Sequence, residues 1–240
     1  LANIAMNYTN LRNYHKALEI NQEVANSSKE ILGENHPDYF KALGNLAGAE
    51  LDVSNYDSAL NHFQIMLEGL RDFLVSNFGN MTEQQRGQLW NYWSLSFAIF
   101  PAFTEKAPNI QYEHNEYLYD LSLFTKSLLL NTLRAFNDML AENGTPEAIV
   151  KFEELKLLKL QIQRLTEKPI AERYLNVDSL ENIAQKKEAE LIKLSKEYGD
   201  YTRNLKINWK DVQNNLKDHD IAIEIVEYPT FTDTVKYAAL

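Results

Sequence analysis

The sequence has no cysteine and few glycines and prolines. Without a thiol, this chain can form no disulfide and no thiolate metal site, and it holds no cysteine nucleophile. Eight glycines and six prolines in 240 residues are too few for a turn-rich β fold. The composition therefore favours a helical protein.

Basic residues are also scarce, since 24 Lys and Arg stand against 34 Asp and Glu, for a net charge of −10. The longest basic run is the pair Lys186–Lys187. Nucleic acids are bound by clusters of Lys and Arg that neutralise phosphates. Nucleic acid is therefore not an expected partner.

Long apolar runs are missing as well. The most apolar windows, residues 89–103 and 118–133, are both interrupted by polar side chains. They fall short of the roughly 18 uninterrupted apolar residues of a membrane span. We expect no membrane association and a cytoplasmic location. Because the chain begins with Leu1 inside a helical pattern, we also expect that an original N-terminal segment precedes it.

Motifs that carry chemistry are absent. The sequence has no phosphate-binding glycine loop, no G-x-S-x-G and no zinc-type histidine spacing. Glu34, His36 and Asp38 resemble a catalytic or metal-binding group. However, Pro37 suits the first turn of a helix and Asp38 suits its positive end, so we interpret the cluster as a linker. We predict no catalytic residue, no metal and no cofactor in this chain.

What the sequence does have is an internal repeat. LANIA at Leu1–Ala5 returns as LGNLA at Leu43–Ala47, and NYHKAL at Asn13–Leu18 returns as NYDSAL at Asn55–Leu60. Both blocks return after 42 residues. The apolar residues within each unit follow helical spacing and are interrupted once. Each unit is therefore predicted to be a helix, a tight turn and a second helix.

These units resemble tetratricopeptide repeats of the long type found in kinesin light chains, over residues 1–75. The matching positions are Leu32, Gly33, His36 and Pro37 in the linker, and Leu43, Asn45, Leu46 and Ala47 in the following helix. Two positions depart from the pattern: Glu50 replaces a usual tyrosine, and Asn21 stands where the second unit has Phe63. The resemblance implies a right-handed helical solenoid whose first helices line a concave binding face.

The best binding candidates are Asn3 and Asn45, at equivalent positions of the two units, with Lys41 beside them. An amide side chain can both donate to and accept from an extended peptide backbone. Solvated amides, or amides bonded to a neighbouring helix, are the alternative. The expected partner is a protein or peptide.

After residue 76 the repeat decays but the pattern stays helical. We predict helices over residues 82–100, stopped at Pro101, and over 113–142, 146–166 and 178–205. Strands are predicted over 221–228 and 235–240. The predicted fold is mainly α: a solenoid over 1–80, a helical capping region over 81–205, and the start of an α/β domain over 206–240.

The C-terminal segment resembles the opening of a CHAT domain, a caspase-like module. The residues that carry this resemblance are Trp209, Asp211, Val212, Leu216, Glu227 and Tyr228. It implies that the chain is truncated and that the catalytic His and Cys of such a domain would lie beyond Leu240.

An aromatic cluster lies where the repeat becomes irregular: Trp90, Tyr92, Trp93, Phe97, Phe100 and Phe103. We interpret it as core packing, with a ligand groove as the alternative.

The leading functional hypothesis is a non-enzymatic interaction scaffold that binds a partner on its repeats and regulates an attached CHAT domain. The alternatives are the N-terminal part of a caspase-like peptidase, inactive in this chain, and a structural or oligomerisation arm. The sequence does not indicate an oligomeric state.

Overall fold

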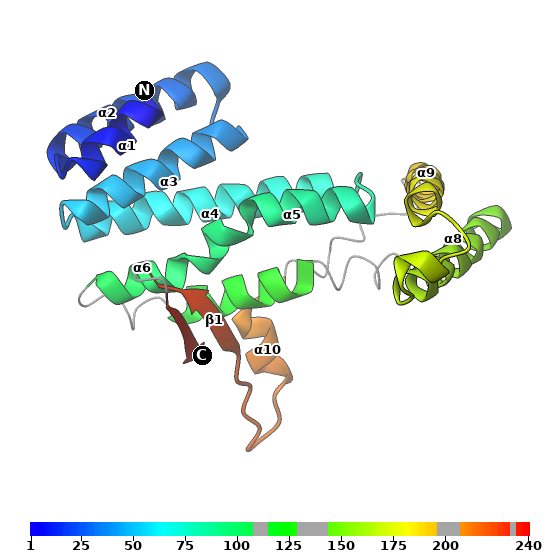
Figure 1. Ribbon diagram of the computed structural model, residues 1–240. Coiled ribbons are helices and arrows are strands. Elements are labelled where there is room, and N and C mark those ends of the chain that lie inside the picture. The colour runs from blue at the N-terminus through cyan, green and yellow to red at the C-terminus, as the bar shows by residue number, and fades with distance from the viewer. Residues whose placement is uncertain (108–114, 129–143, 196–206, 231–233) are drawn as a thin grey trace. The chain divides into compact units, whose positions relative to one another are not determined.

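The computed structural model describes residues 1–107, 115–128, 144–195, 207–230 and 234–240. The fold is mainly α with a small two-stranded sheet, as the sequence predicts (Figure 1). The residues group into two compact units. One contains residues 1–76, 93–122 and 208–240, and the other contains residues 77–92 and 123–207. The three-part division along the sequence, with boundaries at residues 80 and 205, stays a prediction.

The first unit opens with the two predicted helix–turn–helix pairs, α1 (Ala2–Asn10) with α2 (Tyr14–Leu32), and α3 (Pro37–Asp52) with α4 (Tyr56–Phe78). Figure 1 shows neighbouring helices running in opposite directions.

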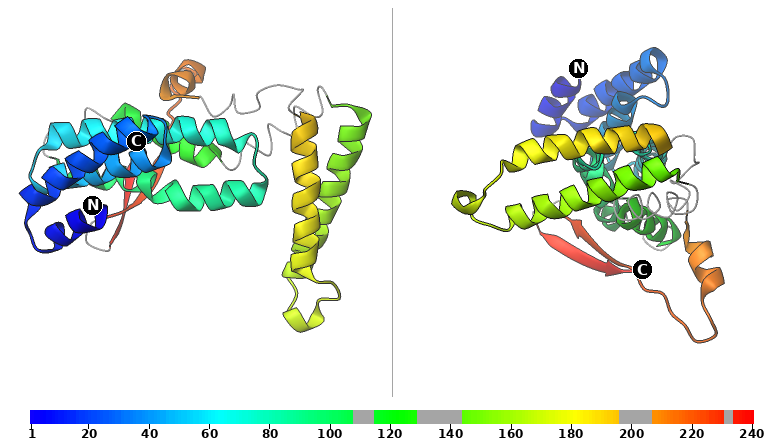
Figure 2. Two further views of the ribbon diagram at one scale, coloured as in Figure 1. Left: turned by 90° about the horizontal axis from the view of Figure 1, so that it is seen from above. Right: turned by 90° about the vertical axis from the view of Figure 1, so that its right-hand side faces the viewer.

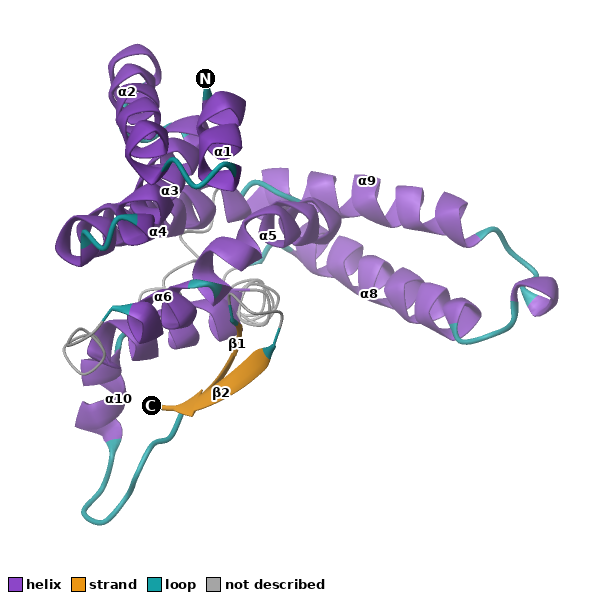
Figure 3. Ribbon diagram, turned by 60° about the vertical axis from the view of Figure 1, so that its left-hand side comes forward, coloured by secondary structure: helices purple, strands orange, loops and turns teal. Residues whose placement is uncertain are grey.

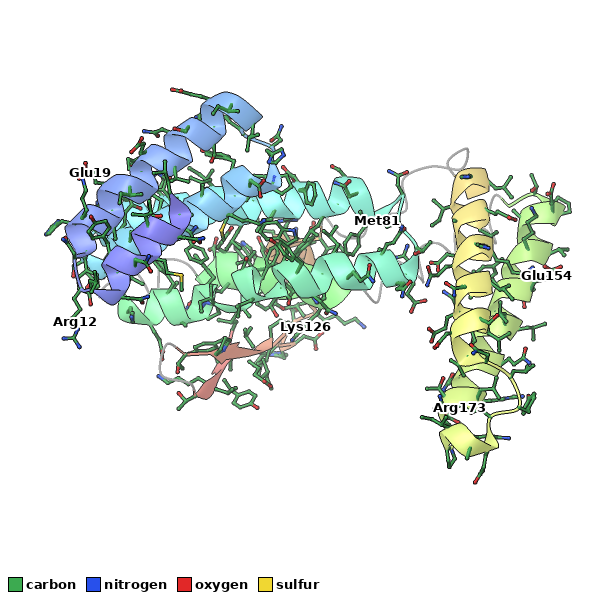
Figure 4. All side chains as sticks on the ribbon, turned by 45° about the horizontal axis from the view of Figure 1, so that its top comes forward. Arg12, Glu19, Met81, Lys126, Glu154 and Arg173 are labelled. Atoms are coloured by element: carbon green, nitrogen blue, oxygen red, sulfur yellow. The ribbon has the colours of Figure 1, made fainter. Side chains whose placement is uncertain are left out.

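The turns of the two pairs repeat as closely as the helices do. Arg12 and Ser54 stand 42 residues apart and are both in the left-handed region, with φ of 58° and 61°. Arg12 lies in the turn that joins α1 to α2 (Figure 4). After each turn, the backbone N–H of an asparagine donates to a backbone carbonyl in the last turn of the preceding helix. Asn13 donates to the carbonyl of Tyr8 at 2.9 Å, and Asn55 donates to the carbonyl of Glu50 at 2.8 Å. The predicted repeat is thus reproduced in backbone detail.

Small side chains let the helices of the repeats approach closely. Ala17 and Ala59, equivalent in the two pairs, are fully buried. Between the pairs, α2 packs on α3 through Ala25, Ala42 and Leu46. Burial of such apolar surface, at about 25 cal/mol per Å², supplies most of the stability of a helical repeat.

The linker prediction for Glu34, His36 and Asp38 is confirmed. His36 caps α3, since its Nδ1 accepts the backbone N–H of Asp38 at 3.1 Å, and Pro37 occupies the first helical turn. Glu34 pairs with Lys29 at 2.6 Å. Each residue of the cluster therefore has a structural task at the junction of two helices.

The predicted helix over residues 82–100 is α5 (Glu83–Ala98), which begins at the expected capping box: the Thr82 N–H donates to Gln85 Oε1, and the Gln85 N–H donates to Thr82 Oγ1. The predicted stop at Pro101 is wrong in one respect. The helix ends before Ile99, and Pro101 lies in the first turn of a second helix, α6 (Phe100–Lys106), where its missing N–H costs nothing.

The core of the first unit beyond the repeats is aromatic. Phe63 of α4 lies 5.7 Å from Phe100 and 5.3 Å from Phe103, measured between ring centroids. Tyr117, in the helical residues 115–128, meets Phe100 edge-on at 5.2 Å. Trp93 and Phe97 are buried as well. The core interpretation of the aromatic cluster holds for these residues, whereas Tyr92 is exposed.

The C-terminal part of the first unit contains α10 (Trp209–Asn215) and an antiparallel hairpin of β1 (Ile225–Pro229) and β2 (Val235–Ala239), shown in Figure 3. Tyr228 is buried on the face that contacts α6, and Lys236 pairs with Glu105 at 2.7 Å. The first strand starts later than the predicted residue 221: β2 pairs with residues 225–229, and beyond them Glu224 and Leu240 exchange two backbone hydrogen bonds.

The second unit is built around a helical hairpin of α8 (Pro146–Thr166) and α9 (Val177–Ser195), joined by a short 3₁₀ turn, η1 (Ile170–Glu172). The two helices lie side by side in both views of Figure 2. Their shared core is formed by Ala148, Leu155, Ala184 and Leu191. The predicted helix over 146–166 is confirmed. The predictions over 113–142 and 178–205 are confirmed for 115–128 and 178–195, and their other residues lie outside the described part.

A buried ion pair joins this hairpin to the first turns of α5 within the second unit. Arg86 and Glu188 are almost fully buried, with Nη2 and Oε1 3.0 Å apart. The same Glu188 oxygen accepts the backbone N–H of Glu83 at 2.9 Å, and Arg86 also donates to the carbonyl of Met81. Such multiple hydrogen bonding is what makes a buried charge pair tolerable.

Candidate functional site

A cleft of about 400 Å³ opens between the first helices of the two repeats. Both predicted amides, Asn3 of α1 and Asn45 of α3, line it and are exposed. Among the described residues, neither amide has a hydrogen-bond partner. Asn3 and Asn45, which the 42-residue offset relates in the sequence, therefore share one cavity. Their side-chain donors and acceptors are available to a ligand.

The floor of the cleft owes its space to small residues. A Cβ added at Gly48 would meet no atom within 4 Å, so this glycine borders open space. At Gly44, one turn earlier, an added Cβ would lie 2.9 Å from the Met66 sulfur, so this glycine instead allows α4 to approach α3. One glycine thus shapes the cavity and the other shapes the packing behind it.

Several lining residues were not predicted. They come from three helices and the end of a fourth: Met6 and Thr9 of α1, Asn21 of α2, Asp52 of α3, and Lys106 of α6. Asp52 could have been found from the sequence, because it follows Asn45 by seven residues and so returns to the same helix face. Lys106 could not, because only the packing of α6 brings it to the repeats.

The cleft carries one acidic and one basic side chain near the end of α3. Partial burial raises the pKa of the Asp52 carboxyl above its ordinary value, and the positive charge of Lys106 opposes this rise. The charges offset each other, and most of the lining is apolar or amide. The chemistry fits an uncharged backbone better than a strongly charged ligand.

Lys41 lies outside the lining of this cleft. Its Nζ is 3.0 Å from Asp38 Oδ1 and 5.8 Å from the centroid of the Trp93 ring. It nevertheless precedes Asn45 by one turn on α3 and so shares its face of the helix. A ligand that extended along α3 beyond the cleft would reach it.

Among the described residues, no candidate metal-binding cluster competes with the cleft. Within the described ranges, no three His, Asp or Glu side chains gather to hold a metal ion. None of the helices described is long and apolar enough to cross a membrane.

Residues 1–72 match the family described as tetratricopeptide repeat. No curated protein and no solved structure matches the chain. The fold, the 42-residue offset and the family match agree that this segment is an array of tetratricopeptide repeats. Repeats of this family generally mediate protein–protein interaction and act as non-catalytic scaffolds.

Proposed function

We propose that the repeats bind an extended segment of a partner protein in the cleft between α1 and α3. The observation that carries the proposal is the pair of exposed amides, Asn3 and Asn45, in one cavity with no partner among the described residues. An amide presents a donor and an acceptor side by side, as a peptide group does.

The size and composition of the cleft support a peptide. About 400 Å³ accommodates a few residues, within the range of roughly 300–1,000 Å³ of ligand sites. Met6 and Ala49 provide apolar contact, and Lys41 would interact with a longer segment along α3. The proposal includes the type of repeat: we infer that these are tetratricopeptide repeats of the long type found in kinesin light chains.

The experiment selects linear peptides from a random displayed library on the 240-residue chain and measures their affinity by fluorescence anisotropy. Gly48→Leu fills the cleft, and we expect it to weaken binding by at least about 30-fold, or roughly 2 kcal/mol. Gly87→Leu is the matched control, because Gly87 also lies in a helix and also borders open space. It should retain affinity within about twofold.

Asn45→Ala tests the amide itself. Loss of one or two hydrogen bonds should weaken the selected peptide by about 5- to 20-fold, without lowering the melting temperature. Selected peptides that bind Gly48→Leu and Asn45→Ala as tightly as the original chain would refute the site.

The C-terminal hairpin supports the second part of the proposal, that the repeats regulate an attached CHAT-type domain in a longer parent protein. One face of the hairpin is covered, whereas Ile225, Val235 and Tyr237 are more than half exposed on the other. A sheet with one exposed apolar face is typically part of a larger layered domain. In this proposal the parent is a caspase-like cysteine peptidase and the present chain is its inactive, partner-binding portion. Reading the parent coding sequence beyond Leu240 for the His and Cys of such a domain tests it.

A further inference from the structure

Helix α8 has two apolar faces, and only one of them is packed against other residues that the structure describes. Ala148 and Leu155 face α9 in the core of the hairpin. On the other side Val150, Leu157 and Leu160 are 58%, 66% and 43% exposed. A lone exposed leucine is ordinary, but a stripe of them along a helix marks an interaction surface.

The spacing of this stripe is that of a coiled-coil seam. Val150, Glu153, Leu157, Leu160 and Arg164 follow one another at intervals of three, four, three and four residues. That alternation keeps side chains on one side of a helix and allows it to pack lengthwise against another helix. All five residues are exposed. The expected occupant of the seam is therefore a helix.

The charges on the seam identify which helix fits. Along the helix, the midpoint between Leu157 and Leu160 falls between residues 158 and 159. The midpoint between Glu153 and Arg164 falls at the same place. A two-fold axis there places Leu157 of one copy against Leu160 of another. The same axis places Glu153 against Arg164 at both ends. The surface is complementary to itself in the antiparallel orientation, as an isologous interface requires.

The nearby charges do not oppose this pairing. Among the described residues, Glu153 has one charged partner, an exposed and loose contact with Lys156 at 3.6 Å, which leaves its carboxylate able to accept another cation. The acidic residue next to the seam, Glu154 of α8, is labelled in Figure 4. It is already neutralised by Lys187 of α9, at 2.6 Å. In a parallel pairing, by contrast, Glu153 would face Glu153 and Arg164 would face Arg164.

We propose that α8 forms an antiparallel pair with α8 of a second copy of this chain, making the protein a homodimer through its helical hairpin. Two apolar layers and two ion pairs form a small contact, so the dimer is weak and depends on concentration. This interface is separate from the peptide cleft of the repeats.

Sedimentation equilibrium of the 240-residue chain, from low to high micromolar concentration, tests the association. We expect a reversible monomer–dimer equilibrium. Leu157→Asp should weaken it by at least about tenfold, whereas Leu95→Asp, a similarly exposed leucine on α5, should leave it unchanged. A chain that stays monomeric throughout, or one that Leu95→Asp disrupts equally, overturns the proposal.

Charge reversal distinguishes a second copy from any other partner. Glu153→Arg and Arg164→Glu should each weaken the dimer at least about tenfold, because each puts like charges opposite one another. The double variant restores both pairs and should recover the original affinity. Circular dichroism checks that all three remain folded. A double variant no better than the single ones overturns the proposed register.

Engineered cysteines test the orientation, since the chain has none of its own. Glu153→Cys combined with Arg164→Cys should give a disulfide-linked dimer under oxidation. The two positions in one chain are about 16 Å apart, too far to bridge within it. Either cysteine alone should give little cross-link, because it faces an unaltered residue. Efficient cross-linking by Glu153→Cys alone would show a parallel pair and refute the proposal.

Discussion

The two repeats have the same backbone and different interiors. Their turns, asparagines and buried alanines correspond after 42 residues, yet Tyr8 and Ile20 of the first repeat correspond to Glu50 and His62 of the second. An aromatic–aliphatic combination in one repeat is thus replaced by a hydrogen-bonded pair in the other. His62 Nδ1 lies 2.8 Å from Glu50 Oε2, and the Glu50 side chain is only 5% exposed.

A second difference decides what each repeat contacts. Asn21 in the first repeat lines the cleft, whereas Phe63 at the same position of the second joins the aromatic core with Phe100 and Phe103. The residues that define the repeat build helices and turns, and the residues that vary give each repeat its neighbours.

The largest effect is expected at the Glu50–His62 contact. His62→Leu leaves the buried Glu50 side chain without this hydrogen-bond partner and should lower the free energy of unfolding by about 3 kcal/mol. The double variant Glu50→Tyr with His62→Ile installs the pair found in the first repeat and should recover most of the loss. Urea unfolding followed by circular dichroism measures both. Equal losses in the single and double variants would show that the loss of stability does not come from leaving Glu50 without a partner.

The next effect concerns close packing in the second repeat. Gly69→Ala places a methyl group against the ring of buried Phe40, and overpacking of this kind costs about 1–3 kcal/mol. Gly44→Ala is the matched control, because the atom it meets is the end of the flexible Met66 side chain. The first repeat has Ser27 and Ala2 at these positions. If both variants unfold at the same urea concentration, the tight packing at Gly69 is disproved.

A smaller effect is expected at the start of α2. The Asn13 side chain accepts the backbone N–H of Lys16 at 3.3 Å and caps this helix. Asn13→Ala removes the cap and should cost about 1 kcal/mol, whereas Asn13→Asp keeps an acceptor and should cost much less. Thermal unfolding of the two variants provides the comparison. Similar melting temperatures for both would contradict the capping role.

The smallest effect is expected at the left-handed turn residues. Arg12 and Ser54 have φ near 60°, where a side chain is strained and glycine is not. Arg12→Gly and Ser54→Gly should each change stability by under about 1 kcal/mol, in the stabilising direction, because relief of strain outweighs the added freedom of the unfolded chain. Matching shifts at the two sites would show that the turns are energetically equivalent, and loss of stability at either would count against strain there.

The repeat region could be predicted well because its signals are local. Apolar spacing, the turn after Leu11 and Val53, and Pro37 at a helix start all act within a few residues. Asn3 and Asn45 could be related to each other because a repeat offset also fixes a helix face. The prediction that Pro101 stops a helix is wrong because proline both ends and begins helices, and the neighbouring sequence does not distinguish the two cases.

The remainder of the cleft could not be predicted, because it depends on which helices meet. Asn21 comes from a second helix and Lys106 from α6, and no local pattern relates either residue to Asn45. The same holds for Arg86 and Glu188, which are 102 residues apart in sequence and 3.0 Å apart in space.

The sequence by itself determined the helices, their turns and the 42-residue equivalence of the two repeats, since short-range sterics and hydrophobic periodicity suffice for these. Only the tertiary structure decided that two equivalent amides share a cleft with Lys106, that Glu50 lies within hydrogen-bonding distance of His62, and that α8 has an exposed apolar face. Those features arise from packing between distant segments, which chain connectivity does not encode locally.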